Sequence, residues 1–365
     1  MKISLTQEKL ARGLNIVSRV VGSRTSLPIL ANILLVAEDG VLTLSATNLE
    51  IALRVTVPCK IDQPGSVTVP AKLLSEVIQG VASDKVQLTS DGDSLNISAA
   101  HVQASLQGMP VDDFPAIPQV NATQLTELPA MEIKNLLERV SRAASLDESR
   151  PVLAGVYLNS QNSQLTLVAT DSYRLAEEKI TLKDVADFSV IIPIRTVQEI
   201  IRLINPDQED SFQLSVGESE IKVVVGEVEL VSRLIEGNFP NYQQIIPTAA
   251  QTTITCRRDE LAAITRLSSV FARESAHTVQ IDIDKDLLKV YAEAAQVGKN
   301  TSELPIELKG QPTQISLNAR FLLDALSAFS EPEVEITLND KLEPCVIRPV
   351  DGPNHSLHLI MPLRS

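Results

Sequence analysis

The segment SVTVPAKLLSEVIQGV, residues 66–81, decides the fold because the chain contains it three times in related form. The other two copies are SVIIPIRTVQEIIRLI, residues 189–204, and QISLNARFLLDALSAF, residues 314–329. In each copy an alternating, strand-like stretch is followed by a short junction and then by apolar residues at helical spacing. Lys72, Arg195 and Arg320 occupy the same place in each copy, 123 and 125 residues apart. The segment therefore predicts a strand followed by a helix, three times over.

Two further sets of segments repeat in the same order around it. Amphipathic helices are predicted at residues 6–22, 129–145 and 257–273, and pairs of strands at residues 42–55, 165–180 and 287–304. Phe114–Pro115 and Phe239–Pro240 close the first two copies. A period of about 120 residues is near the commonest domain size, so each copy should have its own core. We expect three domains, 1–120, 121–248 and 249–365, with boundaries in polar stretches that contain proline.

Within each copy, most of the chain alternates between apolar and polar residues with turn residues between the runs. The stretch VQLTSDGDSLNISA, residues 86–99, shows this pattern around an Asp-Gly turn. The expected fold class is α+β, with antiparallel strands and two helices per domain on one side of a sheet. The alternative is an all-β chain in which the helical patterns are spurious.

The three opening helices should each have an apolar face and a basic face. At about 100° per residue, the expected apolar faces are Leu10, Leu14, Val17 and Val21; Ile133, Leu136, Leu137, Val140 and Ala144; and Ile264, Leu267 and Phe271. The expected basic faces are Lys9, Arg12 and Arg19; Lys134, Arg139 and Arg142; and Arg258, Arg266 and Arg273. The whole chain carries a formal charge of −14, yet the predicted helices carry a basic excess. These faces could meet a polyanion through its backbone, or they could simply be solvated helix surfaces.

The composition limits the classes of protein to consider. With 365 residues, 44% hydrophobic, and neither a membrane-spanning run nor an export signal, the chain should be a cytoplasmic globular protein. Three widely spaced cysteines and four histidines suggest neither a disulfide framework nor a metal site, and no cofactor is expected. The chain contains no phosphate-binding loop, no serine nucleophile motif and no zinc-protease motif, which argues against an enzyme.

Several longer stretches resemble one known family. They are the opening MKISLTQEKLARGLNIVSRVVGSRTSLPILANILL, the central SRPVLAGVYL and VATDSYRLA, the junction EGNFPNYQQIIP and the terminal IMPLRS. Together, over the whole chain, they resemble the bacterial DNA polymerase III beta subunit, the sliding clamp. This resemblance implies a head-to-tail homodimer of three-domain chains that forms a ring around double-stranded DNA without reading its sequence. It also implies a non-catalytic processivity factor for the polymerase, whose partners are the polymerase III alpha subunit, the clamp-loader delta subunit, and other polymerases and repair proteins.

The resemblance also assigns residues to three sites. The residues expected to contact DNA are Arg24, Lys72, Arg150, Arg195 and Arg202. The pocket expected to bind short linear peptides from the partners comprises Leu153, Thr170, Tyr173, Arg174, Leu175, Pro240, Leu359, Met361 and Pro362. The expected dimer interface comprises Ala104 and Leu106 in the first domain and Val270 and Phe271 in the third. Part of the family has a tyrosine pair where this chain has Pro151 and Val152, and often has a larger apolar residue in place of Ala104.

Two other functions compete with this interpretation. A catalytic role for Asp171 can be imagined, but the surrounding sequence is typical of a strand that ends in a turn. A three-domain scaffold that binds only proteins would explain the acidic charge, whereas the basic helix faces oppose it.

Overall fold

The structure is a computed structural model, and it describes residues 1–22, 27–120, 125–182, 185–206, 211–294, 296, 298–351 and 356–363. Its contacts divide the chain into two compact units. Unit 1 comprises Met1–Met131 and Arg202–Leu234, and unit 2 comprises Glu132–Ile201 and Ile235–Ser365.

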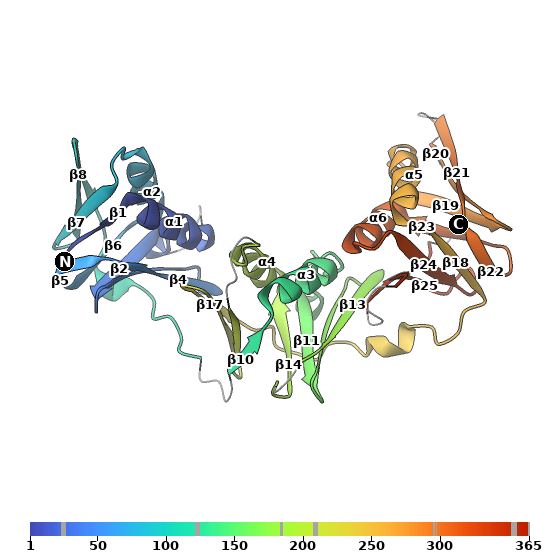
Figure 1. The fold of residues 1–365 in the computed structure, drawn as a ribbon, viewed down its shortest axis with the longest axis horizontal. Helices are drawn as coiled ribbons and strands as arrows, with labels where there is room; N and C mark the ends of the chain where they lie inside the picture. The colour runs from blue at the N-terminus through green and yellow to red at the C-terminus, as the bar shows by residue number, and fades with distance from the viewer. Residues whose placement is uncertain are drawn as a thin grey trace. The chain divides into compact units, whose positions relative to one another are not determined.

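Unit 1 contains two antiparallel sheets and the helices α1 (Gln7–Val17) and α2 (Ala71–Gly80). The five-stranded sheet has the order β5 (Lys60–Gln63), β1 (Lys2–Thr6), β7 (Lys85–Asp91), β8 (Ser94–Ala99), β9 (Val102–Gln107). The eight-stranded sheet has the order β10 (Leu125–Leu128), β15 (Phe212–Val216), β16 (Glu220–Val225), β17 (Val228–Arg233), β4 (Ile51–Pro58), β3 (Val41–Thr47), β2 (Asn32–Glu38), β6 (Gly65–Pro70). The two helices lie side by side, and α1 packs on β3 and β4 (Figure 1).

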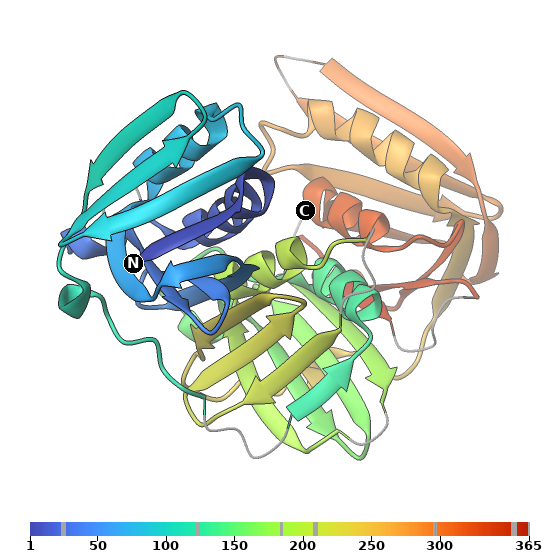
Figure 2. The ribbon, with the colours of Figure 1, turned by 60° about the vertical axis from the view of Figure 1, so that its left-hand side comes forward.

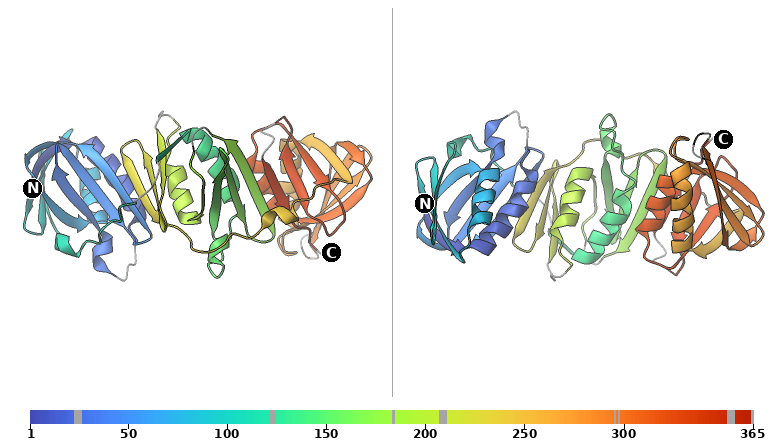
Figure 3. Two further views of the ribbon diagram at one scale, coloured as in Figure 1. Left: turned by 90° about the horizontal axis from the view of Figure 1, so that it is seen from below. Right: turned by 90° about the horizontal axis from the view of Figure 1, so that it is seen from above.

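Unit 2 also contains two antiparallel sheets, with α3 (Ala130–Ser141, whose first two residues belong to unit 1), α4 (Ile194–Leu203, whose last two residues belong to unit 1), α5 (Arg258–Phe271) and α6 (Ala319–Ala328). The nine-stranded sheet has the order β14 (Phe188–Pro193), β11 (Gly155–Gln161), β12 (Gln164–Thr170), β13 (Arg174–Thr181), β26 (Leu357–Ile360), β25 (Cys345–Pro349), β24 (Glu333–Leu338), β18 (Thr252–Arg257), β22 (Glu307–Gly310). The four-stranded sheet has the order β21 (Gly298–Pro305), β20 (Leu287–Ala294), β19 (Thr278–Asp284), β23 (Thr313–Asn318). Helix α5 packs along β20 and β21 (Figure 2) and lies beside α6 (Figure 3).

The six predicted helices are all present, so the all-β alternative is wrong. The three repeated strand–helix segments are β6–α2, β14–α4 and β23–α6, and the predicted strand pairs are the hairpins β3–β4, β12–β13 and β20–β21. The α+β class is therefore confirmed. The domain boundaries at residues 120 and 248 stay predictions.

The predicted apolar faces agree with the structure for α1 and α3, except that Val21 lies beyond α1 and is half-buried, and they agree only in part for α5. Leu10, Leu14 and Val17 of α1 are buried, as are the predicted apolar residues of α3. Helix α5 buries Leu261, Thr265 and Ser268 and leaves Leu267 51% exposed, whereas the predicted Ile264 and Phe271 are partly buried against the core. Small side chains let α5 approach the sheet closely, where the Ser268 hydroxyl donates to Asn300 Oδ1 at 2.8 Å. Polar Ser268 is therefore buried while its neighbour Leu267 is exposed, which the apolar pattern alone does not reveal.

Two strand pairings link segments from successive predicted domains. In unit 1, β4 of the first predicted domain pairs with β17 of the second. In unit 2, β13 of the second predicted domain pairs with β26 of the third. We call these pairings the β4/β17 junction and the β13/β26 junction. In the repeat, β21 is the counterpart of β4 and β13, and β9 is the counterpart of β17 and β26. Both β9 and β21 lie at an edge of their sheet.

Candidate protein-binding groove and basic surface

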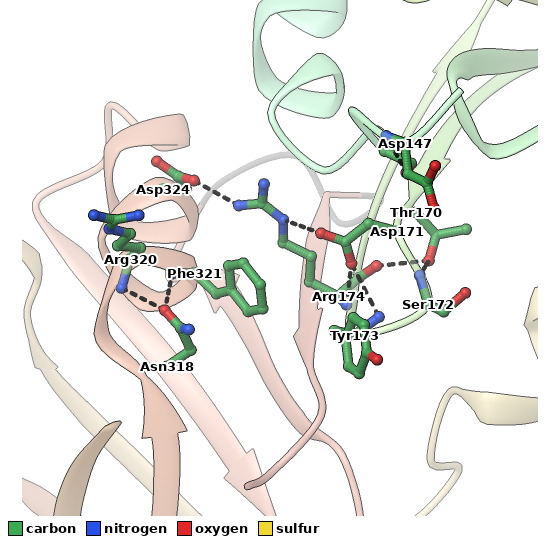
Figure 4. Close-up of polar contacts among 11 residues, drawn as sticks. Asp147, Thr170, Asp171, Ser172, Tyr173, Arg174, Asn318, Arg320, Phe321 and Asp324 are labelled. Atoms are coloured by element: carbon green, nitrogen blue, oxygen red, sulfur yellow. Dashed lines mark hydrogen bonds and ion pairs between the residues drawn. The ribbon is translucent and has the colours of Figure 1, made fainter. Parts of the chain in front are cut away.

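A tight turn between β12 and β13 shapes the candidate groove (Figure 4). Thr170 Oγ1 donates to the carbonyl of Arg174 at 2.6 Å, and it accepts the amide of Ser172 at 3.1 Å. Asp171 Oδ1 accepts the amides of Tyr173 and Arg174, each at 2.9 Å. Ser172 has a φ of +77°, which the turn requires. The Asp171 carboxylate therefore stabilises the turn that the sequence predicts at the end of this strand.

Arg174 is held by partners from two parts of unit 2. Its Nε donates to Asp171 Oδ2 at 3.0 Å, and its Nη1 donates to Asp324 Oδ2 of α6 at 2.5 Å. Its guanidinium also lies 4.4 Å from the ring centre of Phe321, within range of a cation–π interaction. Figure 4 shows this bridge from the turn to α6, whose first turn is capped by the Asn318 side chain. Arg174 therefore fixes the turn against α6.

The groove combines a buried floor with an exposed rim. Leu175 and Leu359 are Cα partners in the β13/β26 junction and pack with Tyr242 in one apolar cluster, against which Phe239 and Met361 also pack. The Met361 amide donates to the Tyr173 carbonyl at 2.8 Å, which keeps the chain beyond β26 beside the turn. Tyr173 is 62% exposed. Of the other expected groove residues, Thr170 and Leu153 are buried, Pro362 is half-buried and Pro240 is exposed.

A second polar group supports the floor from below. The Tyr242 hydroxyl donates to Glu177 Oε2 at 2.6 Å, and Lys179 Nζ lies 2.8 Å from Glu177 Oε1. Burial, followed by the bond to Glu177, raises the pKa of Tyr242 well above its usual range. The phenol therefore remains a hydrogen-bond donor and links Tyr242, at the start of the short helix Tyr242–Ile245, to Glu177 of β13.

The opposite side of β13 carries a buried ionic cluster. Arg139 of α3 lies 3.8 Å from Glu178 and 3.9 Å from Glu331, and Ser356 donates to Glu178. Burial raises the pKa of Glu178 to about 7, although Ser356 and Arg139 both oppose this shift. Burial, followed by nearby arginines, lowers the pKa of His358 to about 3, so this histidine is neutral near pH 7. The expected outward basic position of Arg139 is therefore wrong, since only 16% of its side chain is exposed.

The residues expected to contact DNA are mostly exposed, and Arg24 lies outside the described residues. Lys72, in the first turn of α2, has an 88% exposed side chain near Glu76 at 4.0 Å. In unit 2, Arg150 donates to Ser172 Oγ at 3.2 Å, and Arg195 pairs with Glu148 at 2.8 Å. The loop that contains Glu148 and Arg150 thus joins the first turn of α4 to the groove. Arg202, in the last turn of α4, is exposed.

The residues expected at a dimer interface lie on incompletely covered surfaces. Ala104 and Leu106 are half-buried on the edge strand β9. Val270 is 45% exposed and Phe271 is half-buried near the end of α5. Leu267 of α5 is 51% exposed as well, although the predicted helix face had assigned it to the core.

Among the described residues, no cluster of three histidine, cysteine or acidic side chains could hold a metal ion. Burial raises the pKa of both Cys256 and Cys345 to about 12, so neither thiol is a ready nucleophile.

Across the described residues, every helix is too short or too polar to span a bilayer.

Sequence reasoning missed several residues that shape the groove. Asp324 and Phe321 hold Arg174, Tyr242 and Glu177 support the floor, and Arg139 neutralises Glu178. Their partners are distant in sequence. The only available signal was the run of charge at Glu177, Glu178 and Lys179 within a strand-like stretch.

Comparison with known proteins gives matches over the whole chain. Family models of the DNA polymerase III beta subunit match in three parts: the N-terminal domain over residues 1–118, the central domain over 127–241 and the C-terminal domain over 243–364. The beta sliding clamp of Synechocystis sp. is 31% identical over 389 residues, which cover 100% of this chain and 99% of the relative. That of Chlamydia muridarum is 30% identical with the same coverage. The crystal structure of the DNA polymerase III subunit beta from Pseudomonas aeruginosa matches with a TM-score of 0.96 at 26% identity, covering 100% of both chains.

Proposed function

The chain belongs to the DNA polymerase III beta subunit family, the non-catalytic sliding clamps of DNA replication, and from that premise we propose that two copies close head to tail around duplex DNA and tether the polymerase to it. A closed ring retains DNA by topology, so its contacts to phosphates can be weak enough to allow sliding. A tethered polymerase rebinds at high effective concentration, which gives processivity. Family membership displaces the alternative of a scaffold that binds only proteins.

The repeated strand junction carries the proposal of a dimer. The chain makes this junction twice, by pairing β4 with β17 and β13 with β26. The strands that would make the third, β21 and β9, come from the last and first predicted domains and lie at sheet edges. A junction between β21 of one copy and β9 of another, made twice, closes a symmetric head-to-tail pair with three domains from each chain.

The exposed apolar residues support the same interface. Leu267 and Val270 of α5 are about half exposed, and Phe271 ends the same helix. Half-buried Ala104 and Leu106 lie on β9. Covering these side chains would remove apolar surface from water on both chains, which is the main driving force for association.

We propose that Lys72, Arg150, Arg195 and Arg202, together with Arg24, contact DNA phosphates. Exposure of the first four supports this assignment, and the net charge of −14 opposes general adhesion of DNA to the rest of the surface. Because such contacts release counterions, binding should weaken steeply with salt and should not depend on base sequence.

We propose that the groove beside Tyr173, Pro240 and Met361 binds short linear peptides of the polymerase III alpha subunit, the clamp-loader delta subunit, other polymerases and repair proteins. A methionine and aliphatic side chains over a fixed floor suit an apolar peptide anchor. Because replication of bacterial DNA takes place in the cytoplasm, the proposal includes that location.

Substitution at Phe271 tests the proposal. Phe271→Asp would place a charge in the apolar interface, so sedimentation should give a monomer and the chain should no longer remain on nicked circular DNA after loading. Leu342→Asp is the matched control, since Leu342 is 65% exposed and lies outside the expected interface. A dimeric Phe271→Asp variant that still remains on circular DNA would contradict the proposal.

A further inference from the structure

The turn that shapes the groove occurs a second time, in unit 1. Thr47 Oγ1 donates to the carbonyl of Ile51 at 3.0 Å and accepts the amide of Leu49 at 3.0 Å. Asn48 Oδ1 accepts the amides of Glu50 and Ile51 at 3.0 Å and 2.8 Å. Leu49 has a φ of +75°, against +77° for Ser172. Bond for bond, this turn repeats the one formed by Thr170, Asp171 and Arg174.

The neighbouring strand continues the correspondence. Ile51 and Ala52 pair with Ser232 and Val231, as Arg174 and Leu175 pair with Ile360 and Leu359. The amide of Arg233 donates to the carbonyl of Glu50 at 3.0 Å, as that of Met361 donates to Tyr173. Pro115 follows Phe114 as Pro240 follows Phe239. The backbone that builds the proposed peptide groove is therefore duplicated within unit 1.

The duplicated backbone encloses a hollow, which we call the β4 groove. Its floor is buried and consists of Thr47, Ile51, Ala52, Val231 and Ser232. Its rim includes Leu49, which is 45% exposed, together with exposed Glu50, Pro118 and Arg233. The hollow has a volume of about 80 Å³. Since a cavity of ~150 Å³ holds benzene, the β4 groove has room for one aliphatic side chain and none for a large ring.

The two grooves differ in charge at corresponding positions. Glu50 and Ile51 stand where the other groove has Tyr173 and Arg174, and Arg233 stands where it has Met361. Glu220 also lines the β4 groove, where it accepts from Ser219. Among the described residues, no ion pair neutralises Glu50 or Glu220. Two carboxylates against one guanidinium favour a ligand with a positive charge.

We propose that the β4 groove is a second docking site, for an extended peptide segment of a protein partner that inserts one leucine-sized side chain and places a lysine or arginine beside Glu50. The proposal rests on the proposed peptide role of the groove at the β13/β26 junction, because the two share their backbone. The two sites would take different segments, since their rims differ in charge. One chain could then hold two partners, or two segments of one partner.

Photo-crosslinking to the full chain tests this site even if affinity is weak. The probe is the acetylated peptide Gly-Ser-Lys-Leu-Ser-Gly, in which the leucine carries a diazirine. We expect crosslinks, located by mass spectrometry, on the segments around Leu49, Pro115 and Arg233. Glu50→Lys should reduce their yield at least fivefold, and a probe with glutamate in place of lysine should recover it on that variant. Glu50 is exposed, so the substitution should leave the melting temperature unchanged.

Two control variants separate this proposal from the function of the other groove. Glu227→Lys changes the net charge equally, at an exposed position outside the hollow, and should leave the yield unchanged. Met361→Glu should abolish binding of a polymerase-derived peptide and leave the lysine probe unaffected. Crosslinks that spread over the surface, that move to the segments around Tyr173 and Met361, or that do not respond to Glu50→Lys would overturn the β4 groove. Polymerase peptide binding that survives Met361→Glu would overturn the proposed function of the other groove instead.

Discussion

The β4/β17 and β13/β26 junctions share a backbone arrangement but differ in the side chains that face their helices. In unit 1, Leu53 and Leu230 are paired and completely buried, and Val55 pairs with Val228 two residues further along. In unit 2 the corresponding places hold Ala176 and His358, then Glu178 with Ser356.

This comparison shows that the same backbone arrangement can contain either apolar or ionic side chains on the side that faces the helices. The apolar side chains on the helix-facing side of the β4/β17 junction depend on packing, so their contribution to stability should not depend on pH. An ionic junction depends on every charge keeping its partner, because a buried charge that loses its partner is costly. Repeated structure therefore does not imply repeated energetics.

The largest expected effect is that of removing Arg139. Arg139→Ala would leave Glu178 and Glu331 without their shared cation, so the free energy of unfolding of unit 2 should fall by about 4 kcal/mol. All four tyrosines of the chain lie in unit 2 and tryptophan is absent. Urea unfolding followed by tyrosine fluorescence therefore reports unit 2 alone.

Exposed Arg142→Ala is the matched control and should change the free energy of unfolding by less than about 0.5 kcal/mol. Equal effects of the two variants would refute the ionic junction.

A cavity in the apolar junction should have a somewhat smaller effect. Leu53→Ala removes a completely buried side chain, so the free energy of unfolding of unit 1 should fall by about 3 kcal/mol. The circular-dichroism transition of unit 1 should move to lower urea, whereas the tyrosine transition of unit 2 should stay in place. The loss should be the same at pH 5 and pH 8. A clear pH dependence would show that the two junctions are not distinct in kind.

The pH dependence of Glu178 should have the smallest effect of the three. Its folded pKa of about 7 lies above the unfolded value of 4.5, so the folded chain binds more protons between these values. The titration of Glu178 therefore lowers the free energy of unfolding of unit 2 as the pH rises from 4.5 to 7. A glutamine side chain does not titrate, so the Glu178→Gln variant lacks this decrease. The free energy of unfolding of Glu178→Gln relative to the unmodified chain should therefore increase by about 2 kcal/mol from pH 5 to pH 8.

The contribution of His358 has the opposite sign. Its depressed pKa makes stability rise with pH from about 3 to 6.5. It is common to both chains in the Glu178 comparison and cancels. The difference in the free energy of unfolding between Glu178→Gln and the unmodified chain should therefore change from pH 5 to pH 8. A difference that stays constant over that range would contradict the raised pKa of the buried Glu178 carboxyl.

The repeats and helices could be predicted from sequence because they depend on local patterns that occur three times. The faces of α1 and α3 followed from apolar spacing for the same reason. The face of α5 was predicted only in part, since the polar contact that accompanies the burial of Ser268 joins it to Asn300, which is remote in sequence. The charged residues of β13 are typical of an exposed strand by pattern, and only contacts from α3 and from the segment after α6 explain their burial.

The candidate site was predicted in the same uneven way. The family resemblance supplied its residues, and the sheet pairing that brings Leu175 to Leu359 agrees with that grouping. The support of Arg174 by Asp324 and Phe321 could not be derived, because it depends on how α6 packs. The β4 groove was visible in sequence only as the recurrence of Phe-Pro and of the strand pair.

Cutting the DNA under a loaded chain tests enclosure of the duplex most directly. The labelled chain is placed on nicked circular DNA with a clamp loader, freed of unbound protein, and followed while a restriction enzyme linearises the circle at a single site. Enclosure predicts long retention on the circle and rapid loss from the linear product through its free ends. Equal retention on both forms would show that the chain grips DNA by contact and would contradict the account.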